Sequence, residues 1–144
     1  MRSHPLEAMV NKQAKRLAYI EDEEEMIDLV RLILGHRGYK VLGANGGQEG
    51  LELVRKELPD MILLDLMMPD LDGWDVYHQI KSDNLTRDIP VIVITAKAQD
   101  IDKILGLQVA KVQDYISKPF KPQELVDRIE QFFTMQQEAT NPEN

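Results

Sequence analysis

The apolar residues of this chain follow two alternating spacings. Short, nearly continuous apolar runs alternate with segments in which apolar residues recur every three or four positions. Continuous runs favour buried strands, and the wider spacing is typical of amphipathic helices. The predicted strands are, in chain order, 17–20, 39–44, 61–66, 89–95 and 115–116. The predicted helices lie around 26–34, 51–58, 76–80, 101–107 and 122–133.

This alternation predicts a fold of the α/β class. Strands that alternate with helices form a parallel sheet through right-handed crossovers, with helices on both faces. The run Val91-Ile92-Val93-Ile94 contains no polar residue, as expected for a central strand that is covered on both sides. We therefore predict one folded domain over residues 16–134. Residues 1–15 are expected to be a flexible leader, and residues 135–144 a polar C-terminal tail.

Composition narrows the classes of function. The 144 residues carry a formal net charge of −8, which argues against general nucleic-acid binding. There is no cysteine, so disulfides, thiol nucleophiles and cysteine metal sites are excluded. No apolar run approaches the roughly 18 residues of a membrane span, and no secretory signal is evident. The expected location is the cytoplasm.

The candidate chemistry lies at the ends of the predicted strands. Asp65 lies at the carboxyl end of the apolar run 61–66, where a buried carboxylate is costly unless other groups compensate it. In open parallel sheets, ligands bind at the carboxyl ends of the strands. Other predicted strands also end in polar residues: Glu21 and Asp22 follow the first, Thr95 ends the fourth, and Lys118 follows the fifth.

Together these residue types predict a phosphoryl-transfer site. Three carboxylates in one place require a cation, and oxygen ligands in that number suit Mg²⁺. One carboxylate can then act as a nucleophile and form an acyl phosphate. Lys118 and Thr95 would provide the ammonium and hydroxyl donors that a transferred phosphoryl group needs. The sequence leaves open whether the Lys118-Pro119 bond is cis or trans.

At this point the chain resembles the receiver domain of two-component response regulators, over about residues 16–133. The motifs that carry the resemblance are Glu21-Asp22, Leu64-Asp65-Leu66-Met67-Met68-Pro69, Asp72-Gly73, Thr95-Ala96 and Lys118-Pro119-Phe120. The resemblance implies a flavodoxin-like, doubly wound sheet of five parallel strands in the order 2-1-3-4-5, with five helices.

The resemblance also implies a role for each matching residue. Asp65 would be the phosphoacceptor, and Thr95 and Lys118 would bind the phosphoryl oxygens. The implied metal ligands for Mg²⁺ are Asp22, Asp65, the backbone carbonyl of Met67, and Glu21 either directly or through water. Glu21 stands where the family more often has Asp, and its longer side chain favours the indirect role. Tyr115 matches the aromatic switch position.

The implied partners are a sensor histidine kinase or phosphotransfer protein and an unknown downstream protein. By the same resemblance, two charge pairs occupy positions that join subunits in related receivers: Asp114 with Arg128, and Lys103 with Glu124. This suggests a phosphorylation-promoted homodimer. Direct binding to nucleic acid and insertion into a membrane are not expected.

Three interpretations of function compete. The first is a stand-alone receiver, which the end of the chain soon after its last helix favours; the second is a receiver cut from a longer DNA-binding regulator. The third is a phosphohydrolase with an aspartate nucleophile, which the apolar Met67 two positions after Asp65 disfavours. Single residues also have plainer interpretations, and Asp70 and Asp72 are better placed than Asp65 to cap the helix around 76–80.

Overall fold

The computed structural model describes residues 14–96 and 112–140, which build one parallel sheet covered by helices. The sheet has the order β2-β1-β3-β4-β5, and all four neighbouring pairs are parallel. The predicted order 2-1-3-4-5 is therefore confirmed. The strands are β1 (Arg16–Ile20), β2 (Lys40–Ala44), β3 (Met61–Leu64), β4 (Val91–Thr95) and β5 (Asp114–Ser117).

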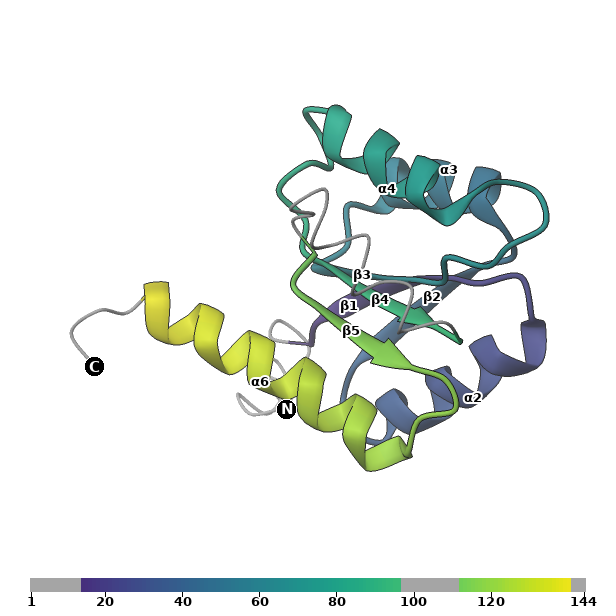
Figure 1. Cartoon of the computed structure of the whole chain (residues 1–144). Helices are drawn as coiled ribbons and strands as arrows, with labels where there is room; N and C mark the ends of the chain where they lie inside the picture. The colour runs from purple at the N-terminus through teal and green to yellow at the C-terminus, as the bar shows by residue number, and fades with distance from the viewer. Residues whose placement is uncertain (1–13, 97–111, 141–144) are drawn as a thin grey trace, which may run out of the picture.

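Helices cover both faces of this sheet. In Figure 1, α3 and α4 lie on one face, and α2 and α6 lie on the other. The described helices are α2 (Glu24–Gly35), α3 (Gly47–Glu57), α4 (Gly73–Ser82) and α6 (Pro122–Thr140). Five helices were predicted and four are described. The predicted helix around 101–107 lies outside the described residues.

Strand alternation divides the core into two layers. In β1, Leu17 and Tyr19 join the buried cluster under α2 and α6, whereas Ala18 and Ile20 join the cluster under α3 and α4. All five residues of β4 are buried, as the unbroken apolar run predicts for a central strand. This alternation also sets the side of the sheet to which each strand-end residue turns.

Several predicted boundaries differ from the structure, and two of the differences concern the segment after β3 and the C-terminal helix. β3 ends at Leu64, not at residue 66, so Asp65 is the first residue after the strand. The chain leaves the sheet there because Gly73, at the start of α4, donates its backbone N–H to the carbonyl oxygen of Leu66 (3.2 Å). At the other end, α6 continues to Thr140. Good helix formers occupy the stretch 135–139, and it contains neither Gly nor Pro.

None of the described helices combines the length and apolar character that crossing a membrane requires.

Candidate functional site

The segments that follow β1, β3 and β5 meet at the carboxyl end of the sheet, beside the last residue of β4. Asp65 donates its backbone N–H to the carbonyl oxygen of Ile20 (3.0 Å), which brings it beside Glu21. On the other side, the backbone N–H of Lys118 donates to the carbonyl oxygen of Thr95 (2.9 Å). Segments far apart in the sequence are thus fastened together by main-chain hydrogen bonds.

Lys118 joins two of the acidic residues. Its Nζ lies 2.6 Å from Oε1 of Glu21 and 3.4 Å from Oδ2 of Asp65. The side chain of Lys118 is only 14% exposed. Burial alone would lower the pKa of Lys118, but the hydrogen bond to Glu21 and the charges of both carboxylates raise it, so the ammonium stays charged. The Lys118-Pro119 peptide bond, which the sequence left open, is cis.

Glu21 is fully buried and accepts three hydrogen bonds. Oε1 accepts from Lys118 and from the hydroxyl of Tyr19 (2.9 Å), and Oε2 accepts from the backbone N–H of Glu23 (3.1 Å). Burial opposes ionisation of this carboxyl group, but the donors from Lys118, Glu23 and Tyr19 hold its pKa below the usual value. Glu21 is therefore a buried carboxylate that the protein partners of both its oxygens keep ionised.

Tyr19 was predicted only as part of the apolar strand 17–20, so its hydrogen bond to Glu21 was not anticipated. A signal was present: Tyr19 lies two positions before Glu21, and alternate strand residues share a face. Burial of Tyr19 and the neighbouring negative charge of Glu21 raise the pKa of the phenol far above its usual value. The hydroxyl therefore stays protonated and acts as a hydrogen-bond donor to Glu21.

Asp65 is 3% exposed and is less well compensated than Glu21. Its Oδ1 accepts the backbone N–H of Met67 (3.1 Å), and its Oδ2 has the long contact to Lys118. Burial is the largest influence and raises the pKa of Asp65 to about 6; the Met67 N–H opposes this, and the charge of Glu21 adds to it. The site thus holds one carboxylate whose ionised form is under-stabilised.

Three carboxylates are close enough to hold one metal ion. One oxygen from each of Glu21, Asp22 and Asp65 lies within 4.8 Å of the others. Burial and then the neighbouring Glu21 raise the pKa of Asp22, as expected for acids that repel one another. Hard oxygen donors in this arrangement fit Mg²⁺, which also retains water ligands. Asp22 is the most exposed of the three, which suits a ligand at the entrance of the site.

Thr95 and Tyr115 lie on neighbouring strands beside this cluster. The hydroxyl of Thr95 is buried and has no hydrogen-bond partner within the part of the chain that the structure describes. A buried hydroxyl without a partner is uncommon and suits an incoming ligand oxygen. Tyr115 is partly buried and packs against the α3–α4 side of the core. Its strand partner is Val93, two residues before Thr95.

The loop after Asp65 is held tightly by α3 and α4. A Cβ atom on Gly73 would lie 2.3 Å from the Cα of Leu66, so only glycine permits this approach. Asp72 caps α4 by accepting the backbone N–H of Trp74 (2.8 Å), as predicted. Asp70, predicted as an alternative cap for α4, instead accepts from Gly47 and Gln48 at the start of α3.

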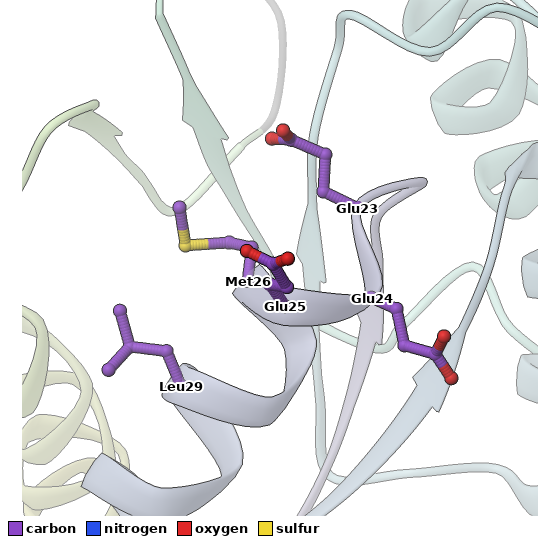
Figure 2. Close-up of a pocket in the computed structure, with 5 residues that line it drawn as sticks. All are labelled: Glu23, Glu24, Glu25, Met26 and Leu29. Atoms are coloured by element: carbon purple, nitrogen blue, oxygen red, sulfur yellow. The ribbon is translucent and has the colours of Figure 1, made fainter.

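A surface depression lies beside the site, along the first turns of α2 (Figure 2). Its lining residues are Glu23, Glu24, Glu25, Met26 and Leu29. Leu29 is 45% exposed although it is apolar. The approach to the carboxylate cluster from this side therefore combines negative charge with apolar surface.

The charge pair predicted between subunits forms within one chain. Arg128 of α6 lies 2.6 Å from Oδ1 of Asp114 and 3.8 Å from Oε2 of Glu124. Lys103, of the second predicted pair, lies outside the described residues. The Asp114–Arg128 pair thus needs no second subunit to form.

The fold and the site define a class: a doubly wound α/β protein with a lysine-bridged carboxylate cluster at the strand ends. A family model described as the response regulator receiver domain matches residues 17–130. The chain is 38% identical over 115 residues to the alkaline phosphatase synthesis transcriptional regulatory protein PhoP of Bacillus subtilis (strain 168). This match covers 80% of this chain and 47% of PhoP. It is 37% identical over 116 residues to the regulatory protein VanRc of Enterococcus gallinarum, covering 81% of this chain and 48% of that protein.

The chain therefore belongs to the response regulator receiver domain family. It spans about half the length of these two curated relatives.

Solved structures agree with this assignment. A putative response regulator from Chloroflexus aurantiacus J-10-fl has a TM-score of 0.74 at 32% identity, over 83% of this chain and 97% of that one. The receiver domain of the sensor histidine kinase PA1611 from Pseudomonas aeruginosa PAO1, with a magnesium ion coordinated in its active site cleft, has a TM-score of 0.73 at 28% identity. That match covers 82% of this chain and 96% of that one.

Proposed function

We propose that Asp65 accepts a phosphoryl group from a phosphohistidine of a sensor kinase or phosphotransfer protein. The P–N bond to the imidazole breaks as a P–O bond to the Asp65 carboxylate forms, giving an acyl phosphate. The observation that carries this proposal is the Lys118 ammonium, 3.4 Å from Asp65 within a cluster of three acids. A fixed positive charge beside the nucleophile stabilises the charge on the transferred oxygens.

The proposed reaction requires Mg²⁺. Asp22, Asp65 and the Met67 carbonyl would be the direct ligands, and Glu21, whose oxygens already accept three protein donors, would act through water. When bound, the ion supplies positive charge that offsets the negative oxygens of the incoming group. The unpartnered hydroxyl of Thr95 and the ammonium of Lys118 would bind the other phosphoryl oxygens.

The test is incubation with acetyl phosphate and Mg²⁺, followed by intact mass spectrometry. The proposal expects the added mass of a single phosphoryl group, its absence when EDTA replaces Mg²⁺, and its absence in Asp65→Asn. Equal labelling of Asp65→Asn would overturn the assignment of the phosphoacceptor. Continuous turnover of a generic phosphate ester would instead favour the phosphohydrolase alternative.

We further propose that phosphorylation works as a switch. Thr95 would move toward the phosphoryl group, and Tyr115 would occupy the space that Thr95 leaves, which shifts the population of surfaces around β5 and α6. The partly buried position of Tyr115, and its place on the neighbouring strand opposite Val93, two residues before Thr95, support this. Substituting Thr95→Ala should leave phosphorylation measurable but remove the chemical-shift changes of Tyr115 that accompany it in NMR spectra.

We also propose that phosphorylation promotes a homodimer. Asp114 and Arg128 would then either keep their pair within one chain or exchange it for a pair between chains. Light scattering with and without beryllofluoride tests this, and an unchanged monomer mass contradicts it.

We propose that the domain works in the cytoplasm, either as a stand-alone receiver or as the receiver of a longer regulator. The transcriptional role in the name of PhoP favours the longer regulator. The length of the full gene decides between the two.

A further inference from the structure

We propose that Tyr19 is a positioning residue for the metal and phosphoryl site, acting through Glu21. This inference rests on the proposed function, because it assigns a role in the same site. Among the described residues, the hydroxyl of Tyr19 makes no hydrogen bond to Asp65. Its one described hydrogen bond is to Oε1 of Glu21, at 2.9 Å.

The hydrogen bonds of Glu21 show what Tyr19 adds. A carboxylate oxygen has about two favourable acceptor directions. On Oε1 these are taken by the Tyr19 hydroxyl and by the Lys118 ammonium (2.6 Å), while the Glu23 N–H takes one direction on Oε2. Tyr19 and Glu23 therefore hold the carboxylate from two sides, and one acceptor direction is left on Oε2.

The hydroxyl of Tyr19 is not needed for packing. Tyr19 is fully buried in the apolar cluster under α2 and α6, among residues such as Leu17 and Leu63. Phenylalanine would fill the same ring volume there without burying a polar atom. A buried hydroxyl is costly unless it is bonded, and in the described chain its partner is a carboxylate of the site. The hydroxyl therefore points to a role at the site.

Tyr19 matters most when Lys118 changes partner. In the unphosphorylated structure Lys118 lies nearer to Glu21 than to Asp65, at 2.6 Å against 3.4 Å. When Lys118 turns toward a phosphoryl group on Asp65, Glu21 loses its nearest cation while it stays fully buried. The Tyr19 hydroxyl remains on the same oxygen, so the carboxylate keeps a donor and the loss is smaller.

The test measures Mg²⁺ affinity of the unphosphorylated full chain by isothermal titration calorimetry. Tyr19→Phe should weaken Mg²⁺ binding roughly tenfold, because residues that orient metal-site carboxylates have effects of about this size. The matched control is Tyr39→Phe, which removes a phenolic hydroxyl just before β2, at the opposite end of the sheet, and keeps the ring that stacks on Phe133. Its Mg²⁺ affinity should equal that of the wild type.

A double-mutant cycle separates positioning from a general structural effect. In a Glu21→Met background, the further change Tyr19→Phe should not alter Mg²⁺ affinity, because methionine has no carboxylate oxygen to accept the Tyr19 hydroxyl. An equal loss in both backgrounds would overturn the inference, as would an unchanged affinity in Tyr19→Phe alone.

A second measurement needs no variant and covers the case in which Tyr19→Phe fails to fold. In wild-type protein with ¹³C-labelled tyrosine rings, the Tyr19 signal should shift on addition of Mg²⁺ while the Tyr39 signal stays in place. A stationary Tyr19 signal overturns the inference. If the wild type binds no Mg²⁺ and takes no phosphoryl group from acetyl phosphate, the proposed function itself fails; if it does both and Tyr19→Phe matches it, only the role of Tyr19 fails.

Discussion

Two ion pairs at opposite ends of β1 have the same length and different surroundings. Arg16, the first residue of β1, lies 2.6 Å from Oε1 of Glu57. Glu21, directly after β1, accepts Lys118 at the same distance of 2.6 Å. The side chains of the first pair are 35% and 33% exposed, whereas those of the second are 14% and 0% exposed.

This difference shows that burial, rather than distance, sets the energetic weight of each pair. Water screens the exposed pair, and such pairs typically contribute about 0–1 kcal/mol. In the buried pair, the Glu21 carboxylate cannot be rehydrated if Lys118 is removed, because its side chain is 0% exposed. The carboxyl end of the sheet thus concentrates charge that is costly when unpaired, which is consistent with the exchange of partners proposed for Lys118.

The largest expected effect comes from breaking the buried pair. Lys118→Met should lower the free energy of unfolding by about 3–5 kcal/mol, because Glu21 stays buried without its cation. Urea denaturation at neutral pH without divalent cations measures this. A loss below about 1 kcal/mol would mean that the buried pair behaves like a surface pair.

Removing the charge of Asp65 should have the opposite effect, and it should depend on pH. The pKa of Asp65 is raised to about 6, so folding favours its neutral form. Wild-type protein should therefore lose up to about 3 kcal/mol relative to Asp65→Asn as the pH rises from about 4 to above 6. Unfolding curves at a series of pH values, in EDTA, test this. Parallel profiles for the two proteins would contradict it.

A carboxylate at the exposed part of the same rim should matter less. Asp72 caps α4 through the N–H of Trp74 and is exposed. Asp72→Ala should cost about 1 kcal/mol, as is usual for an N-cap, while Asp72→Ser should restore most of the loss. Urea denaturation of both variants checks this. A loss as large as that of Lys118→Met would show that the whole rim, and not only its buried part, is sensitive.

The smallest effect is expected at the other end of β1. Arg16→Met keeps a long apolar side chain and removes the pair with Glu57, so the free energy of unfolding should fall by less than about 1 kcal/mol. The effect should shrink further in high salt, which screens exposed charges. A salt-independent loss of several kcal/mol would remove the contrast between the two ends.

Much of the architecture could be predicted because the fold repeats one simple pattern. The unbroken run 91–94 predicted a covered central strand, and all of β4 is buried. Once the sheet is parallel, strand ends must share an edge, so Asp65 and Lys118 could be placed together although 53 positions separate them. That inference needed only strand spacing and direction.

Boundaries and local contacts were harder to predict, because they depend on neighbouring elements. β3 stops at Leu64 because the start of α4 contacts the backbone of Leu66, which spacing within the strand does not reveal. The carboxylate of Asp70 could accept hydrogen bonds from the first turn of either α3 or α4. Its position in the folded loop places it at the start of α3. Both outcomes follow from tertiary packing rather than from intrinsic preference.

The sequence by itself determined the strands, their order through the family motifs, and the acidic and basic residues that reach the carboxyl end of the sheet. Only the tertiary structure decided how those residues pair: Lys118 lies nearer to Glu21 than to Asp65, and the Tyr19 hydroxyl shares the oxygen that holds Lys118. The reason is geometric. Apolar spacing specifies which face a side chain takes, but hydrogen-bond partners are selected by differences of less than an ångström, which arise only when the packed helices fix the strands and loops in place.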